Sequence, residues 1–238
     1  MNALKVLFIH SLRERTSHLT RNLLAGGIFL IIPVMRVFEH GQGGLPGANT
    51  ALWLSLIYGA GLIGPDASSG VLELVLTRPV TRTQYVLARW LSAIALAGGA
   101  AVFQTMVVAA IMAAYGHAPG LAAVSAIVPQ LAVAIALPAV LICFSAMTAG
   151  YGDLRIWVLL LVFGELVEMA GNMRHWAWLA RVGKEIGGLM VPVMGQGALR
   201  DLLRFPWTPV IAWLSTVVLA LAVAIAVLNR RELSHGGS

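Results

Sequence analysis

Long apolar stretches separated by short polar connections dominate the chain. Six of them approach the roughly 20 apolar residues that a helix needs to cross about 30 Å of hydrocarbon. The pattern therefore predicts an all-α integral membrane protein, with residues 1–238 forming a single transmembrane domain. The six expected spans are 23–38, 50–64, 85–115, 121–149, 156–170 and 209–228.

The first 21 residues have a different pattern, in which apolar and charged positions mix at helical spacing. Leu4, Leu7, Phe8 and Leu12 fall on one face, beside charged residues that continue to Arg21. This arrangement predicts an amphipathic helix in the membrane interface. A cleaved signal peptide is disfavoured, because no short apolar stretch here ends in a small-residue cleavage site.

Composition and charge support the same class. Apolar residues make up 59% of the chain and charged residues 11%, and the mean hydropathy is +0.85. The net charge of +6 comes from basic residues scattered over short connections. That distribution fits membrane topology rather than nucleic-acid binding. It predicts a protein of the cell membrane, inner or plasma, with both termini on the cytoplasmic side.

One connection resists this orientation rule. Residues 172–207, assigned to the outer face, contain five basic residues and several tryptophans. We expect one or two interfacial or re-entrant helices there, anchored at headgroup level by Trp176 and Trp178. If residues 189–194 instead completed a crossing, the last span would be inverted.

The connection between the second and third spans is the most informative one. Asp66, Ser68 and Ser69 are residues that favour helix starts, and Pro79 ends the short apolar helix that follows. Thr81 and Gln84 then fit a capping box at the start of the third span. The pattern predicts a short amphipathic helix at the cytoplasmic surface. It serves either as a lever for a soluble partner or as a simple connector.

The run from Gly70 to Arg89, GVLELVLTRPVTRTQYVLAR, resembles the signature of ABC-2 type transporter permeases. In that family a small-residue turn, an apolar helix containing Glu and a Pro-Val-x-Arg segment join the second and third spans. The match is strong over about twenty residues. It extends loosely over the rest of the chain through the six-span plan, the N-terminal helix and the outer helices.

The resemblance implies the transmembrane subunit of an ABC exporter. Such a subunit works as a dimer with a second permease copy or homologue and with two cytoplasmic ATPase subunits, which bind ATP and Mg²⁺. Residues 70–78 then correspond to the coupling helix that docks into the ATPase. The residues that the resemblance assigns to this contact are Gly70, Leu72, Glu73, Leu74, Thr77, Arg78 and Arg82.

Two carboxylates in the fifth span form a second candidate site. Glu165 and Glu168 lie three residues apart, on one helix face. Carboxylates in a membrane span are costly and are functional candidates, here for a cationic substrate path or for a salt bridge in the dimer. The alternative is that both reach the outer headgroups near Arg174.

The sequence contains no nucleotide-binding, metalloprotease or hydrolase motif. No Gly-x-x-x-x-Gly-Lys-Ser/Thr loop occurs, so no enzymatic activity, cofactor or metal is expected of this chain itself. The single cysteine, Cys143, cannot form a disulfide within one chain. A membrane scaffold that recruits cytoplasmic proteins without transport is the alternative function.

Overall fold

The computed structural model of the chain describes residues 3–77, 80–117, 119–190 and 207–230, and every regular element in those ranges is a helix. The helices are α1 (Ala3–Ser17), α2 (Leu19–Phe38), α3 (Ala48–Gly59), α4 (Gly64–Ser68), α5 (Val71–Leu76), α6 (Arg82–Ala114), α7 (Gly120–Met147), α8 (Gly152–Met173), α9 (Ala177–Met190) and α10 (Trp207–Arg230).

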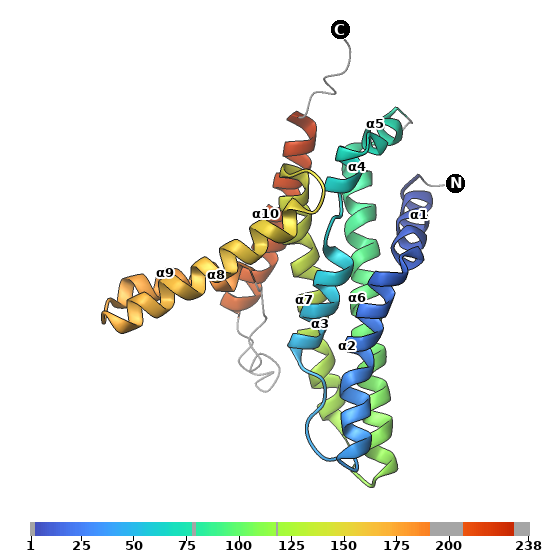
Figure 1. Cartoon of the computed structure of the whole chain (residues 1–238), viewed down its shortest axis with the longest axis vertical. Helices are drawn as coiled ribbons and strands as arrows, with labels where there is room; N and C mark the ends of the chain where they lie inside the picture. Colours follow the sequence, from blue (N-terminus) through green and yellow to red (C-terminus); the bar gives the residue numbers. More distant parts are fainter. Residues whose placement is uncertain (1–2, 78–79, 118, 191–206, 231–238) are drawn as a thin grey trace.

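An elongated bundle of α2, α3, α6 and α7 forms the body of the molecule (Figure 1). α10 packs against α7, and α8 and α9 form a hairpin that projects sideways from the bundle. α1, α4 and α5 lie at the end of the bundle where the two termini are found. The connections that follow α2 and α6 lie at the opposite end.

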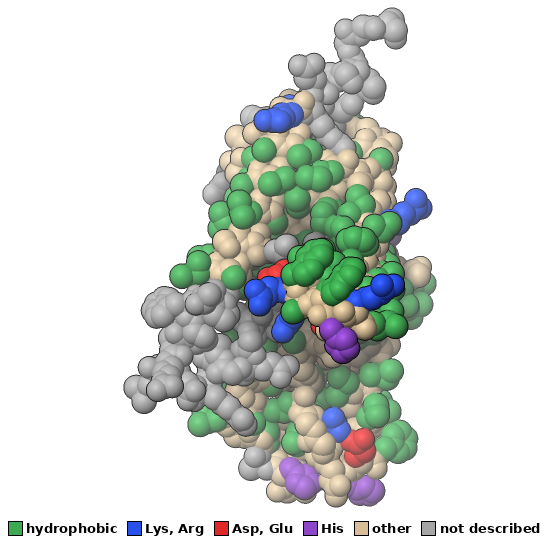
Figure 2. Space-filling model, turned by 90° about the vertical axis from the view of Figure 1, so that its left-hand side faces the viewer, with side chains coloured by type: hydrophobic (Ala, Val, Ile, Leu, Met, Phe, Trp, Pro, Cys, Tyr) green, Lys and Arg blue, Asp and Glu red, His purple; other side chains and the backbone are tan. Residues whose placement is uncertain are grey.

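Four helices in the described ranges are long and apolar enough to cross a membrane. They are Leu19–Phe38, Arg82–Ala114, Gly120–Met147 and Val210–Arg230. They correspond to the first, third, fourth and sixth expected spans. Figure 2 shows the consequence at the surface, where apolar side chains cover much of the visible face and charged ones are sparse. The expectation of a helical membrane protein is confirmed at this level.

The other two expected spans do not reach that standard. α3 has 12 residues and is therefore about 18 Å long, and the chain leaves helical geometry before α4 begins. α8 has 22 residues, but it contains Asp153 and Arg155 as well as Glu165 and Glu168. The count of six spans is therefore not confirmed.

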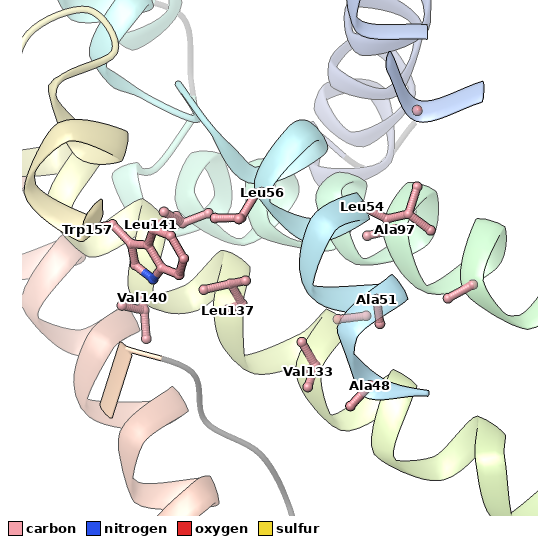
Figure 3. Close-up of a cluster of buried hydrophobic side chains, with 13 residues drawn as sticks. Ala48, Ala51, Leu54, Leu56, Ala97, Val133, Leu137, Val140, Leu141 and Trp157 are labelled. Atoms are coloured by element: carbon pink, nitrogen blue, oxygen red, sulfur yellow. The ribbon is translucent and has the colours of Figure 1, made fainter. Parts of the chain in front are cut away.

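Small side chains let the central helices approach closely. Ala93, Ala97 and Ala101 recur every fourth residue of α6 and are fully buried, as this spacing predicts for a packing face. Figure 3 shows the largest side chain of the adjoining core, Trp157 of α8, lying against Leu141 of α7. The base of the projecting hairpin is thus part of the bundle core.

Prolines interrupt the backbone hydrogen bonding of α7, and indoles of neighbouring helices contact the backbone near Pro138. Pro138 lacks the N–H that a helix would direct to residue 134. Trp90 of α6 donates to the carbonyl of Ile135 at 2.9 Å, and Trp213 of α10 donates to that of Ala132 at 3.0 Å. These bonds fix α6 and α10 to the middle of α7.

The segment after α8 was expected to contain one or two interfacial or re-entrant helices. α9 confirms that a helix is present, while residues 191–206 lie outside the described ranges. The contact between α9 and α8 depends on glycines, because the two backbones approach too closely for a side chain. A Cβ atom at Gly183 would lie 2.3 Å from the backbone nitrogen of Glu168, and one at Gly171 would lie 2.3 Å from that of Ala180.

We predict that Gly183→Ala destabilises the protein by about 1–3 kcal/mol, because the added methyl forces α8 and α9 apart. Gly188→Ala is the matched control. A Cβ at this position meets no atom within 4 Å, so the change will be neutral or will stabilise α9 by up to about 1 kcal/mol. Thermal unfolding of the two variants in detergent checks this, and equal midpoints would contradict the packing described here.

Candidate functional site

The non-helical break between α3 and α4 is held by side chains from other helices. The backbone N–H groups of Ile63 and Gly64 both donate to Ser145 Oγ of α7, each at 2.9 Å. The N–H of Gly61 donates to Asp153 Oδ2 of α8 at 2.7 Å. Buried backbone groups that lack a partner cost several kcal/mol each in an apolar environment. These hydrogen bonds therefore allow the chain to turn inside the bundle.

Carbonyl groups at the same break accept hydrogen bonds from Arg15 of α1. Its guanidinium donates to the carbonyl of Tyr58 and, at 3.5 Å, to that of Gly61. The last carbonyls of a helix carry partial negative charge, so a cation there is favourable. Arg15 is one of two buried residues of α1, the other being Ser11. The amphipathic pattern predicted an apolar face for the membrane interface and gave no signal for these two buried polar positions.

A second set of buried polar side chains lies next to this break, and Arg89 of α6 is at its centre. Arg89 forms ion pairs with Asp66 of α4 and with Glu14 of α1, the latter at 2.6 Å. Its Nε donates to the hydroxyl of Tyr85 at 3.3 Å, and Tyr85 in turn donates to Asp66. Ser11 and Ser92, whose hydroxyls are 2.7 Å apart, complete what we call the Arg89 cluster.

The Arg89 cluster joins three elements that are far apart in sequence. α1 contributes Ser11 and Glu14, α4 contributes Asp66, and α6 contributes the rest. Removing one partner of a buried ion pair typically costs about 3–5 kcal/mol, because the remaining charge is left uncompensated. The interaction therefore fixes the position of α4 relative to α1 and to the N-terminal turns of α6.

Asp66 was named as a residue that favours a helix start, and it lies in the first turn of α4. Its side chain has a further role that the sequence did not indicate, because it is buried and accepts hydrogen bonds from Tyr85 and Arg89. The sequence did contain a signal for the pairing of Arg89. An arginine within an apolar run more than 25 residues long is costly unless a carboxylate is paired with it, so the run itself indicates that a partner exists.

The short helix expected between the second and third spans is present as α5. Gly70 precedes it with a φ of +76°, a conformation that favours glycine. Leu72 is buried, whereas Leu74 is 69% exposed and Thr77 is exposed as well. The side chain of Glu73 and all of Arg78 lie outside the described part of the chain.

At the start of α6 the predicted capping box is present, but Arg82 is less exposed than a docking residue should be. Thr81 and Gln84 form the capping box, with each side chain paired to the other's backbone N–H at 3.2 Å. Arg82, by contrast, belongs to the residues that the resemblance assigns to the ATPase contact, where its side chain would be exposed. It is half-buried and donates to the carbonyl of Leu228 near the end of α10. The last carbonyls of a helix attract a cation, and Arg82 lies close enough to those of α10 to bind one of them.

A cavity of about 420 Å³ lies between α1 and the α4–α6 segment. Asp66, Glu14 and Arg89 line it, together with apolar side chains such as Leu7 and Val75. Within the described residues, no group of three or more His, Cys, Asp or Glu side chains is arranged to hold a metal ion. The cavity lies between α1 and α5, and the Arg89 cluster, which joins α1 to α4 and α6, forms one side of it.

Glu165 and Glu168 lie on α8, where the hairpin leaves the bundle. Glu165 is exposed and Glu168 is half-buried, and both line a shallow hollow with Leu161 and Met169. Neither forms an ion pair with Arg174 or with any other described residue. Their role in a substrate path or in a dimer salt bridge stays a prediction.

We predict that Arg89→Gln destabilises the protein by about 3–5 kcal/mol and releases α1, because Asp66 and Glu14 lose their counter-ion. Trypsin will then cut faster after Lys5, a site that the control variant also keeps. Arg13→Gln, an exposed change on the same helix, is the control and will alter stability by less than about 0.5 kcal/mol. If α1 resists trypsin equally in both variants, the cluster does not hold it.

We also predict a pH dependence from Glu14. Burial by itself would raise the pKa of Glu14, but the adjacent Arg89 outweighs it, and the pKa lies below its ordinary value. The folded protein then binds fewer protons than the unfolded chain at mildly acidic pH, so the stabilisation is complete above about pH 4.3 and disappears as the pH falls further. The difference in unfolding midpoint between wild type and Glu14→Gln should shrink below that pH, and a constant difference would refute the assignment.

No protein-family model matches this chain, and no curated protein sequence matches it either.

Proposed function

We propose that this chain is the permease subunit of an ATP-binding cassette exporter, located in a cell membrane and driven by ATPase subunits on its cytoplasmic face. The twenty-residue run from Gly70 to Arg89 supports the proposal by its resemblance to ABC-2 permeases. In this arrangement six crossings place both termini in the cytoplasm. Two ATPase subunits bind ATP and Mg²⁺, and a second permease copy or homologue completes the complex.

The observation that carries the proposal is the linkage between the surface segment α4–α5 and the 33-residue helix α6. Asp66 of α4 is paired with Arg89, four residues after Tyr85 and one turn beyond the capping box. A displacement of α4 therefore acts on α6 through a buried ion pair rather than through a flexible loop. This is the mechanical property that a coupling element requires.

The exposed side chains of α5 suit a protein partner. Leu74 and Val71 are both exposed apolar residues at the end of the molecule that the orientation rule places in the cytoplasm. Isolated apolar side chains at a surface are common, but α5 has two among its six residues. The buried Leu72 anchors this helix to the rest of the protein, so the two exposed side chains form a fixed apolar surface for a partner.

A membrane scaffold without transport would use the same α5 surface. The two functions differ in what binding does, because a scaffold recruits its partner without changing the partner's ATP hydrolysis. The linkage of α4 to α6 favours transport, since a scaffold gains nothing from transmitting movement into a spanning helix.

We predict that Leu74→Glu weakens association with the ATPase by about tenfold or more, because a charge replaces an apolar contact. Leu121→Glu is the matched control. Leu121 is 86% exposed and lies at the start of α7, at the opposite end of the bundle, so association is unchanged. Co-purification of the complex from the membrane measures both. Equal recovery of the ATPase with the two variants would place the contact elsewhere.

We predict that Glu73→Lys abolishes substrate-stimulated ATP hydrolysis while the complex stays in the membrane, because the charge on the coupling element is reversed. ATP turnover of the reconstituted complex is the measurement. Unchanged stimulation would reject Glu73 as a coupling residue, and an ATPase that never co-purifies with the wild-type chain would favour the scaffold.

A further inference from the structure

A further hollow in the molecule, an apolar groove of about 900 Å³, lies between α2, α3 and α8. Leu24 of α2, Leu56 of α3 and Trp157 of α8 are among its lining residues. Figure 3 shows Leu56 and Trp157 approaching from their two helices. The volume falls in the upper part of the range of about 300–1,000 Å³ that small-molecule sites occupy.

The groove has basic residues at one end only. His18 and Arg21, at the junction of α1 and α2, line it together with the apolar residues. The lining residues from α3 and α8 carry no charge. Arg21 is half-buried and forms no ion pair with any described residue. The groove is therefore amphipathic along its length, with a cationic end and an apolar body.

No described carboxylate forms an ion pair with Arg21 itself. Glu14 and Asp66 are both paired with Arg89, and Asp153 accepts hydrogen bonds from backbone N–H groups. Burial, followed by the charges of Arg89 and Arg21, lowers the pKa of the neighbouring Arg15 to about 9. An anion placed beside Arg21 would relieve this repulsion.

The depth of the charged end fits a lipid headgroup. α2 is a candidate span that begins at Leu19, so Arg21 lies within its first turn, at the membrane surface where α1 packs. Arginine side chains at that depth reach the headgroup region. Trp53, which is 55% exposed, lines the groove and adds an aromatic surface suited to an acyl chain.

We propose that this groove binds one acyl-chain lipid with an anionic headgroup, taken from the cytoplasmic leaflet. The headgroup contacts His18 and Arg21, and the acyl chain lies along Leu24, Leu56 and Trp157. Naming this lipid class as the substrate of the permease rests on the proposed function, whereas binding itself does not.

The test uses the purified full-length chain in neutral detergent, without an ATPase. The probe is 11-(dansylamino)undecanoate, and its uncharged methyl ester is the comparison. Energy transfer from tryptophan to the dansyl group reports binding. We expect saturable binding of the carboxylate, one molecule per chain, and about tenfold weaker binding of the ester, the difference typical of one charge-assisted hydrogen bond.

Variants separate the headgroup end from the apolar body. Arg21→Gln should weaken binding of the carboxylate about tenfold, to the level of the ester, and leave the ester unaffected. Arg21→Lys keeps the charge and should retain most of the affinity. Arg13→Gln, an exposed basic residue that does not line the groove, is the control and should change nothing. Leu24→Trp fills the apolar body and should weaken both probes.

Equal affinity for acid and ester would overturn the proposal, because it would mean partition into any apolar surface. Binding that falls as the chain dimerises would also overturn it, since a second copy would then occupy the groove. If Arg21→Gln fails to fold, the comparison of acid with ester and Leu24→Trp still decide. Probe binding by a chain that never associates with an ATPase would support the lipid groove and reject the permease. Association with an ATPase without probe binding would support the permease and reject the lipid groove.

Discussion

The structure depends on one constraint: the chain turns inside an apolar bundle, between α3 and α4, and every polar backbone group exposed by the turn needs a partner. Arg15 supplies donors to the carbonyls, while Ser145 and Asp153 accept from the N–H groups. These three side chains belong to α1, α7 and α8. The same hydrogen bonds therefore locate the N-terminal helix against the bundle and determine where α8 begins, because losing any one of them leaves a buried group unsatisfied.

The Arg89 cluster extends this arrangement to the surface. Arg89 cannot remain charged among the apolar side chains of α6 without carboxylates, and the nearest ones come from α4 and α1. The short segment α4–α5 is thereby attached to a spanning helix by an ion pair that water reaches poorly. A partner that contacts Leu74 would act on this attachment, which is why the linkage favours a coupling role over passive recruitment.

Part of this could be predicted from the sequence. The apolar runs gave the four helices that are long enough to cross a membrane, and the Thr81–Gln84 capping box and the alanine spacing of α6 are local patterns that the structure confirms. Arg15 and Arg82 were counted among the basic residues that orient the chain, but each binds a backbone carbonyl of another helix. Such contacts join residues 43 or more positions apart, and no local pattern encodes them.

The sequence by itself determined the class of protein, because the free energy of placing apolar or charged residues in lipid depends on composition and periodicity alone. It also determined the short helix before α6, whose start and end are local. Only the tertiary structure decided that the Asp66 side chain is buried and paired with Arg89, that α3 stops after 12 residues, and that the groove beside Arg21 combines an apolar body with a cationic end. Each of these depends on which side chains from distant helices meet a given backbone group or charge.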